Sequence, residues 1–498
     1  MAGIRNSRIL QPILFLFAVC IVSLPAQAAD VNDSDIRAAG GASTYVFVPN
    51  QSTVVQTGGI AGVHWVYSIE GKFQLSVDPN APNSGIASFI YVDANATDDS
   101  PYRRTLDPNE VFNMTELVGT VIGDTIIVFM GKADDGSDVL IIAFLNDDLV
   151  YLVGQTFPPA SSADFFIFSL NAVAQRKYGG GTGEPNDPYQ IATAEDLMLL
   201  GETPEDYDKH FILTADIDLD PNLPGRRIFD RAVIAPDVND AEHWFQGSPF
   251  TGTFDGDNHT ISHLTITGGG DLGLFGRTGS GAKISNLGLE AVDVNGTGWC
   301  VGGLVGWNFG SITTSYSTGS VSGGYCVGGL VGHNSEGSIT SCYSTGTVSG
   351  KDSVGGLVGE SCGVPAPSII TASYSTGSVI GDDDVGGLVG SNGGWFGMGS
   401  ITNSYSTGAV SGDRSVGGLV GRNLEDKGSI TSSFWDIQTS GQTESAGGVG
   451  KATNEMQTAG TFLDAGWDFV GETANGTEDI WWILEGKDYP RLWWEAHN

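Results

Sequence analysis

Basic residues are scarce in this sequence. Lysine and arginine total 22 against 58 aspartates and glutamates, which gives a net charge of −36 at pH 7 over 498 residues. A surface this acidic repels phosphate backbones and anionic lipids, so nucleic acid is excluded as an expected partner. Proline is also sparse at 19 residues, and no Gly-X-Y triplet recurs, which excludes collagen.

Long apolar runs are missing beyond the N-terminus. The one short run, residues 13–24, follows Arg5 and Arg8 and precedes an A-x-A site that ends at Ala28. This order is typical of a secretory signal peptide, so we expect residues 1–28 to be removed on export. Since no second run reaches spanning length, we expect an exported protein that does not span the membrane. Its expected location is extracellular, at the cell surface or in the periplasm.

Residues 29–178 contain short strand-like runs separated by turn signals. The turn signals include Glu70-Gly71, Asp135-Gly136 and the stretch 146–148. Short strands joined by tight turns predict a small antiparallel β-sandwich or barrel domain. This region offers no recognisable chemical motif. Residues 179–249 follow as a hinge, rich in glycine at 179–185, and as an N-terminal cap in which Thr193 begins a short helix.

Glycine is present in excess, at 73 residues, and is concentrated in a repeat. Gly-Gly-Leu-Val-Gly occurs at 302–306, 328–332, 355–359, 386–390 and 417–421. The copies are 26 to 31 residues apart, too short for a propeller blade and without the period of a helical solenoid. Three short strands and three turns fit this length, so we expect an all-β parallel β-helix over residues 250–450. Residues 451–498, with four clustered tryptophans, are expected to cap its last coil.

Equivalent residues of such coils stack into ladders. An isoleucine lies four residues before each aromatic of the Ser-Tyr-Ser-Thr-Gly segment, and a valine follows five residues after each tyrosine. We expect these three ladders in the core, although a tyrosine stripe exposed to grip sugar rings is the alternative. An asparagine ladder at 308, 334, 392 and 423 is broken by Ser361, and its stacked amides are expected to hydrogen-bond along the solenoid.

These copies resemble the GLUG repeat, a glycine-leucine-any-glycine motif of bacterial exported and surface proteins. The pattern is matched by Gly303–Gly306 and by the four later copies. The resemblance implies a right-handed parallel β-helix and an adhesin-like surface role, and it carries no catalytic residues.

The mature chain holds four cysteines, at 300, 326, 342 and 362. Cys300 and Cys326 both lie two residues before a Gly-Gly pair, so they stack on adjacent coils at a spacing that a disulfide accepts. A Cys300–Cys326 disulfide is therefore predicted for an oxidising compartment. Metal binding by cysteine is less favoured because the sequence has no C-x-x-C pair.

The same corner of each coil carries the remaining candidates for a binding site. Trp299 and Tyr325 stand at one end of the row and are predicted to stack on sugar rings. At the other end, Asp352, Asp382, Asp383 and Asp384 offer the hard oxygen ligands that calcium prefers. A solvated, charged corner without a ligand is the simpler interpretation of these acids.

The sequence thus predicts a non-catalytic, exported interaction module that binds glycans or another surface polymer. The alternatives are a polysaccharide lyase or hydrolase on the same scaffold, and a purely structural envelope protein. The enzyme would rest on Asp255 and Asp257, which share a strand face and form a carboxylate pair. The pairing of His259 with His263 as metal ligands is improbable because a strand holds them about 13 Å apart. The oligomeric state is left open.

Overall fold

The computed structural model describes nine strands between residues 43 and 174, and then residues 177–239, 245–394, 397–424 and 426–496. The predicted signal peptide, residues 1–28, lies outside the described residues. The chain divides into two compact units, Met1–Arg176 and Lys177–Asn498, which are described separately.

The strands of the first unit form one antiparallel sheet. They are β1 (Ser43–Phe47), β2 (Thr53–Thr57), β3 (His64–Val77), β4 (Ser84–Ala96), β5 (Leu117–Ile122), β6 (Ile126–Lys132), β7 (Asp138–Asn146), β8 (Leu149–Phe157) and β9 (Phe165–Ala174). The sheet closes on itself, because β3 pairs with both β2 and β4 while β2 continues through β9 to β5. An antiparallel domain was predicted here, and of the two forms expected the structure has the closed one.

One predicted turn in this sheet is wrong. Glu70-Gly71 lies inside β3, where Gly71 pairs with Val92 of β4. The register between β3 and β4 shifts between Lys72 and Phe73, where β4 has one extra residue, and β3 continues through this point without reversing. By contrast, β7 and β8 are joined directly after Asn146, which pairs with Leu149, as the turn signal there predicted.

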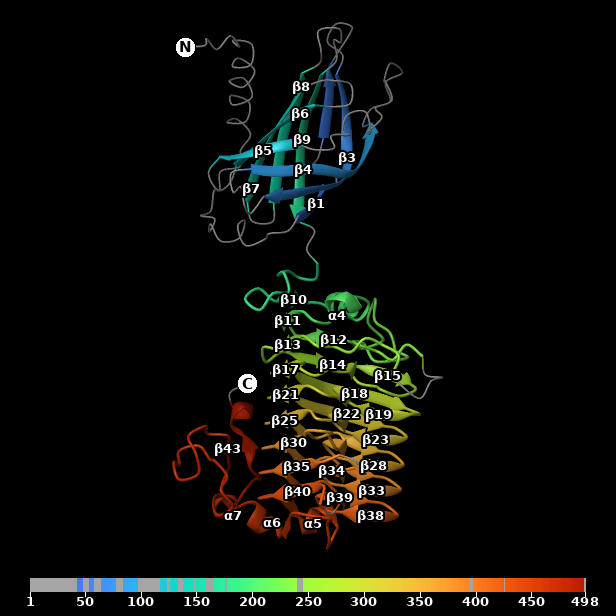
Figure 1. Ribbon diagram of the computed structural model, residues 1–498, viewed down its shortest axis with the longest axis vertical. Helices are drawn as coiled ribbons and strands as arrows, with labels where there is room; N and C mark the ends of the chain where they lie inside the picture. The colour runs from blue at the N-terminus through green and yellow to red at the C-terminus, as the bar shows by residue number, and fades with distance from the viewer. Residues whose placement is uncertain are drawn as a thin grey trace. The chain divides into compact units, whose positions relative to one another are not determined.

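The second unit is a parallel β-solenoid, as the repeat predicted (Figure 1). An isoleucine sheet consists of β10 (Tyr189–Ile191), β11 (His210–Leu213), β13 (Thr253–Asp255), β17 (Lys283–Ser285), β21 (Ser311–Thr313), β25 (Ser338–Thr340), β30 (Ser368–Thr371), β35 (Gly399–Thr402) and β40 (Gly428–Thr431). A tyrosine sheet consists of β12 (Ile217–Asp218), β14 (Thr260–Ser262), β15 (Thr265–Gly268), β18 (Gly288–Gly296), β22 (Tyr316–Ser322), β26 (Tyr343–Ser344), β27 (Thr347–Ser349), β31 (Tyr374–Ser375), β32 (Val379–Ile380), β36 (Tyr405–Ser406), β37 (Val410–Ser411), β41 (Phe434–Asp436) and β42 (Val449–Lys451).

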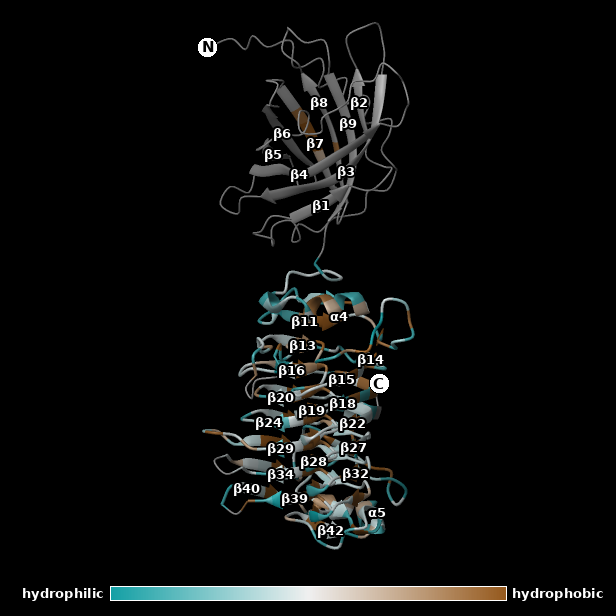
Figure 2. Ribbon diagram, turned by 90° about the vertical axis from the view of Figure 1, so that its right-hand side faces the viewer, coloured by the Kyte–Doolittle hydropathy of each residue, from teal (hydrophilic) through white to brown (hydrophobic). Residues whose placement is uncertain are grey.

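Two shorter sheets complete the coils on either side of each Gly-Gly-Leu-Val-Gly copy. A corner sheet precedes the copies and consists of β19 (Trp299–Gly302), β23 (Tyr325–Gly328), β28 (Asp352–Gly355), β33 (Asp383–Gly386) and β38 (Arg414–Gly417). A motif sheet begins within them and consists of β16 (Phe275–Arg277), β20 (Val305–Asn308), β24 (Val331–Asn334), β29 (Val358–Ser361), β34 (Val389–Asn392) and β39 (Val420–Asn423). Figure 2 shows these strands as stacked rungs that mix hydrophilic and hydrophobic residues.

The helix α4 (Ala194–Gly201) lies across the first end of the solenoid, next to β11 (Figure 1). Its capping box confirms the helix start predicted at Thr193, because the Thr193 side chain accepts from the Asp196 backbone while the Asp196 carboxylate accepts in return. A 3-10 turn, η1 (Pro204–Asp206), follows it. Leu197 and Leu200 are fully buried, so α4 covers the apolar lumen that an open end would expose.

The isoleucine, valine and asparagine ladders are confirmed. Ile312, Ile339, Ile370 and Ile401 are buried in the lumen with Val321 and Val348, while Ile430 of the last coil is half-buried. Along the asparagine ladder, the Asn308 Nδ2 donates to Asn334 Oδ1 at 2.8 Å, and the Asn392 Nδ2 donates to Asn423 Oδ1 at 2.8 Å. At the break, Ser361 and Ser368 share a hydrogen bond of 2.8 Å.

The tyrosine ladder lies outside the lumen, contrary to the expectation that it shares a face with isoleucine. A residue with positive φ, such as Thr314 (φ 49°) or Ser341 (φ 53°), stands between each isoleucine and its tyrosine and turns the backbone. The tyrosines therefore stack on the outer face, with ring centroids of Tyr343 and Tyr374 4.9 Å apart. Tyr374 is nonetheless fully buried, so the ladder is not an open sugar-binding stripe at this end.

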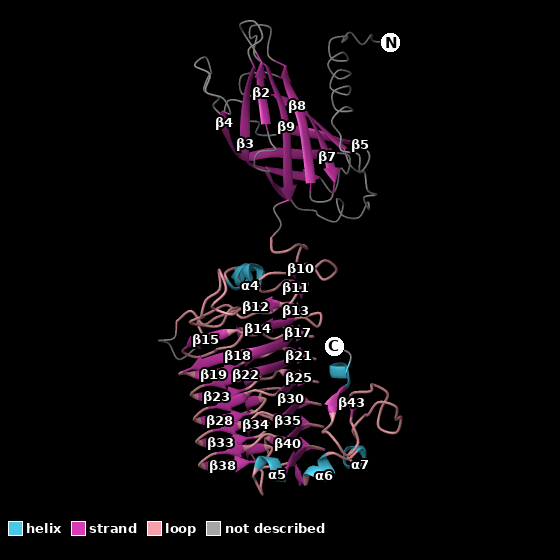
Figure 3. Cartoon of the chain, turned by 180° about the vertical axis from the view of Figure 1, so that it is seen from behind, coloured by secondary structure: helices cyan, strands magenta, loops and turns pink. Residues whose placement is uncertain are grey.

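The C-terminal segment covers this outer ladder. The helices α5 (Ile437–Ser440), α6 (Thr453–Met456) and α7 (Ala459–Leu463) lie at the last coil. The chain then runs back along the side of the stacked coils through β43 (Trp481–Trp482), β44 (Arg491–Leu492) and η2 (Trp493–Ala496) (Figure 3). Trp481 is fully buried, with its ring 6.0 Å from that of Tyr405, and Trp494 lies 5.6 Å from Tyr343. The tryptophan-rich segment therefore packs along the side of the solenoid as well as at its end.

Candidate functional site

Two columns of side chains face each other along the corner of the solenoid. The left-handed column holds the residue two positions before each Gly-Gly pair or its equivalent, and every member has a φ between 49° and 58°: Asp271, Cys300, Cys326, Ser353, Asp384 and Ser415. The facing column holds residues that pair in register along the motif sheet: Arg277, Trp307, His333, Glu360, Ser391 and Arg422.

The last glycine of each repeat brings the two columns together. A Cβ on Gly359 would lie 2.4 Å from the carbonyl carbon of Cys326, and a Cβ on Gly421 would lie 2.5 Å from that of Asp384. Only glycine permits this approach of one coil to the left-handed residue of the preceding coil. The residue after the glycine is then placed against that column, as Glu360 is against Cys326 and Arg422 against Asp384.

Asp271 and Arg277 occupy the first end of the corner. Burial, and then the nearby charges of Cys300 and Asp237, raises the pKa of Asp271 from 3.8 to about 8 against the opposing effect of Arg277. The Arg277 guanidinium lies over the Trp307 ring at 4.4 Å and near Phe309 at 4.9 Å. These cation–π contacts fix the Arg277 guanidinium at the first end of the corner.

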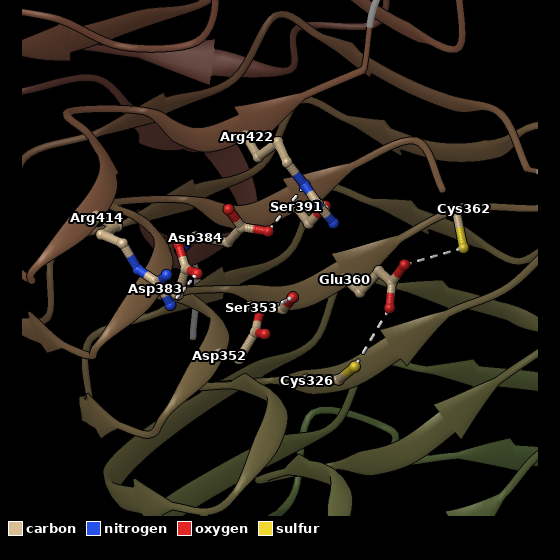
Figure 4. A network of polar contacts seen from close by, with 10 residues as sticks. All are labelled: Cys326, Asp352, Ser353, Glu360, Cys362, Asp383, Asp384, Ser391, Arg414 and Arg422. Atoms are coloured by element: carbon tan, nitrogen blue, oxygen red, sulfur yellow. Dashed lines mark hydrogen bonds and ion pairs between the residues drawn. The ribbon is translucent and has the colours of Figure 1, made fainter. Parts of the chain in front are cut away.

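Thiol, imidazole and carboxylate groups meet at the centre of the corner. The Cys326 Sγ lies 3.3 Å from Glu360 Oε2, and the Cys362 Sγ lies 3.5 Å from Glu360 Oε1 and 3.3 Å from His333 Nε2. Figure 4 shows the Glu360 carboxylate between Cys326 and Cys362. Among the residues that the structure describes, His333, Glu360 and Cys362 form the one group of three or more potential metal-ligating side chains whose ligand atoms converge within 4.8 Å.

Cys300 lies on the coil before Cys326 and forms hydrogen bonds with Cys326 and His333. A hydrogen bond with Cys326 lowers the pKa of the Cys300 thiol to about 6. Burial raises this pKa, and a hydrogen bond with His333 lowers it further. Burial lowers the pKa of His333, but hydrogen bonds to Cys300 and Cys362 outweigh it and hold the pKa well above its ordinary value. All four described cysteines are thiols in the structure, so the Cys300–Cys326 disulfide stays a prediction.

The predicted calcium ligands are only partly brought together. Asp383 Oδ2 pairs with Arg414 Nη2 at 2.7 Å, and Asp384 Oδ2 pairs with Arg422 Nε at 2.8 Å (Figure 4). Asp382 is exposed, while Asp352 Oδ1 accepts from the Ser353 hydroxyl at 2.9 Å. Burial raises the pKa of Asp384 in spite of Arg422. The calcium site stays a prediction in which two of the carboxylates already have cationic partners.

The predicted aromatic pair does come together. Trp299 and Tyr325 occupy neighbouring strands of the corner sheet, and their rings stack 4.5 Å apart at an interplanar angle of 17°. Trp299 is 61% exposed and Tyr325 is 37% exposed. The structure thus places a flat, exposed aromatic surface at the first end of this row.

The carboxylate pair of the enzyme alternative has a local structural role. Asp255 Oδ1 accepts from the Asp257 backbone N–H at 3.0 Å and from Asn286 Nδ2 at 2.9 Å, which closes a turn where Asp257 has a positive φ of 47°. His259 and His263 are separately paired with aspartates of the neighbouring β12 region, at 3.1 Å to Asp216 and 2.9 Å to Asp218.

Sequence reasoning missed the cluster of His333, Glu360 and Cys362. The three residues lie in different coils or at a coil's end, and no local motif joins them. The repeat itself carried the signal, because His333 and Glu360 occupy the same position after consecutive Leu-Val-Gly segments. Aligning the repeats and reading down each column would have placed them side by side.

The repeats belong to a known class. Residues 297–322, 323–349 and 383–411 match the family model described as the GLUG motif, and they lie within the parallel solenoid. Three repeats of the second unit thus match the GLUG motif within a parallel β-solenoid. The strand register continues the same repeat through the copies at 355–359 and 417–421.

Two curated proteins resemble parts of this chain. Over 144 residues it is 33% identical to "Halomucin" of Haloquadratum walsbyi, a match that covers 28% of this chain and 1% of that protein. Over 63 residues it is 38% identical to a "Putative Gly-rich membrane protein" of Evansella cellulosilytica, covering 13% of this chain and 6% of that protein. The chain thus spans only a small part of the length of either relative. Within the described part of the chain, the helices all lack the length and apolar character needed to span a membrane.

Proposed function

We propose that this chain is an exported, surface-associated module that binds glycan chains through the stacked Trp299–Tyr325 pair. The observation that carries the proposal is the exposure of two parallel aromatic rings on a rigid corner sheet. An aromatic face offers an apolar surface to the C–H face of a sugar ring, and fixing it on two paired strands lowers the entropy lost on binding.

Charge narrows the class of glycan. The net charge of −36 disfavours polyanionic sugars such as sulfated or uronate-rich chains. Asp352 pairs in register with Tyr325 on the next strand of the corner sheet, and Asp383 pairs in register with Asp352. The surface beyond the rings is therefore acidic. A neutral or basic glycan therefore fits this corner best.

The surface location draws on the sequence and the relatives. The predicted signal peptide supports export, and the match to a protein named as a membrane protein supports association with the cell envelope. A solenoid of stacked coils also suits this role, because it presents one binding surface on a rigid scaffold. An adhesin-like function follows if the glycan belongs to another cell or to the surrounding matrix.

A glycan array probed with the full chain, with and without calcium, tests the proposal. We expect binding to neutral or amino sugars that Trp299→Ala weakens about tenfold or more, since losing a central aromatic contact costs at least about 1.4 kcal/mol. Trp493→Ala is the matched control, because it removes a tryptophan of 38% exposure elsewhere and should leave binding unchanged.

Three results would count against the proposal. These are an array without binding, binding that is equal in Trp299→Ala and the wild type, and release of reducing ends that Asp255→Asn abolishes. The last result would establish a polysaccharide-degrading enzyme instead. If glycan binding required calcium, the binding site would include the predicted calcium ligands, Asp352 and Asp382–Asp384, as well as the aromatic pair.

A further inference from the structure

The centre of the corner brings four metal-ligating side chains together from two consecutive coils. Cys326 comes from β23, His333 from β24 and Glu360 from β29, and Cys362 follows directly after β29. Cys326 is buried, and the other three are half-buried, so the donor atoms are shielded from bulk water yet open to entry of an ion.

Three of these residues converge as the ligands of one ion do, because the donor atoms of His333, Glu360 and Cys362 lie within 4.8 Å of one another, and Cys326 contacts the second oxygen of Glu360. The successive distances are 3.3 Å from Cys326 Sγ to Glu360 Oε2, 3.5 Å from Glu360 Oε1 to Cys362 Sγ and 3.3 Å from Cys362 Sγ to His333 Nε2. Zinc bonds of about 2.0–2.3 Å in a tetrahedron place neighbouring ligand atoms about 3.3–3.8 Å apart. We propose that Cys326, His333, Glu360 and Cys362 bind a transition-metal ion of the zinc class.

The ligand types select the metal. Two thiolates and an imidazole favour zinc and similar ions, whereas calcium and magnesium take oxygen ligands. Glu360 also differs from Asp384, a carboxylate of the left-handed column farther along the corner. Asp384 is neutralised by Arg422, while among the described residues no lysine or arginine forms an ion pair with Glu360. The carboxylate is therefore available to a metal ion.

A bound ion would link the coils that carry these ligands. Each ligand lies in or beside a strand that hydrogen-bonds to its neighbours, so the ion adds a cross-link perpendicular to the strands. The site and the predicted Cys300–Cys326 disulfide exclude each other, because both require the Cys326 sulfur.

Titration of the reduced, metal-stripped full chain with Zn²⁺ against a chromophoric chelator tests the site. We expect one Zn²⁺ per chain, a rise in melting temperature on binding, and little competition from Ca²⁺. Glu360→Gln and Cys362→Ser should each weaken Zn²⁺ binding by about 100-fold or more, because even outer-shell changes cost 10–100-fold. Cys342→Ser is the matched control, since this thiol lies in the lumen with its Sγ 3.2 Å from Thr340 O, and the variant should bind Zn²⁺ as the wild type does.

A second readout separates loss of ligand from loss of fold. The metal-free variants should melt near the metal-free wild type, while only the wild type and Cys342→Ser gain stability with Zn²⁺. The proposal is overturned by an absence of stoichiometric Zn²⁺ binding, or by unchanged affinity in both ligand variants. It is equally overturned if peptide mapping of the exported protein finds Cys300 joined to Cys326.

Discussion

The backbone conformation and the surroundings of a residue at the corner of this solenoid depend on its column. Asp271 shows the effect on a titratable group, because its position at the first end of the left-handed column buries it beside Cys300 and Asp237. The pKa of its carboxyl is about 8, against an ordinary value of 3.8. The folded state therefore binds this proton more tightly than the unfolded chain does.

The pH dependence of stability follows from that shift. The contribution of Asp271 is fully present below about pH 4 and is lost as the pH rises through about 8. We expect Asp271→Asn, which keeps the size of the side chain without the charge, to melt at a higher temperature than the wild type at about pH 9 and at a similar temperature at about pH 4. Thermal melts of the two proteins across this range check the prediction, and parallel curves with a constant difference would contradict it.

Among the elements, the strands of the corner and motif sheets depend on the repeat glycines for their spacing. The last glycine of each copy lies against the left-handed residue of the coil before it, so added side-chain volume there separates two strands. The sequence predicted the solenoid and the buried isoleucine ladder because their period is visible in one dimension. It did not predict that the tyrosines point outward. Residues i and i+4 share a face only in a continuous strand, and single residues such as Thr314 adopt a positive φ that turns the backbone between isoleucine and tyrosine.

Substitution of a repeat glycine tests the contribution of this spacing. Gly359→Ala places a Cβ 2.4 Å from backbone atoms of Cys326 and Val327, and we expect it to lower the free energy of unfolding by about 2–3 kcal/mol. Gly460→Ala in α7 is the control, since its nearest neighbouring atom lies 4.0 Å away and alanine favours a helix. Urea unfolding of both variants measures the difference. Equal stability of the two variants would contradict the close approach of the coils.

At the scale of the whole solenoid unit, the C-terminal segment completes the fold by covering an outer face. Tyr405 Oη donates to Pro490 O at 2.6 Å, and Tyr374 Oη donates to Glu495 Oε2 at 2.9 Å, although these partners are distant in sequence. The clustered tryptophans of residues 451–498 predicted a cap from the sequence. Its path along the tyrosine ladder was not predictable, because it depends on which face the tyrosines occupy.

Removal of a buried tryptophan tests this cover. Trp481 is fully buried against Tyr405 and Trp467, and we expect Trp481→Ala to cost about 3–5 kcal/mol of stability. Exposure of the tyrosine ladder should also increase binding of a hydrophobic dye. Trp493→Ala, at 38% exposure, should cost far less. Indistinguishable melting temperatures for the two variants would show that the segment does not stabilise the solenoid.

The same limit on sequence reasoning applies to the binding corner. The exposed pair of Trp299 and Tyr325 was predictable, because one column position contains both. Glu360 and Cys362 were not, because their meeting with Cys326 requires contact between a left-handed column and a facing column of successive coils. These contacts join residues of successive coils that no local sequence motif connects.

X-ray absorption at the zinc edge of the zinc-loaded full chain shows whether these residues bind one ion. We expect a mixed first shell with two sulfur scatterers at about 2.3 Å, from Cys326 and Cys362, and nitrogen and oxygen scatterers at about 2.0–2.2 Å, from His333 and Glu360. One sulfur scatterer should remain in Cys362→Ser. A first shell of only nitrogen and oxygen in the wild type, or one unchanged by that substitution, would contradict this expectation.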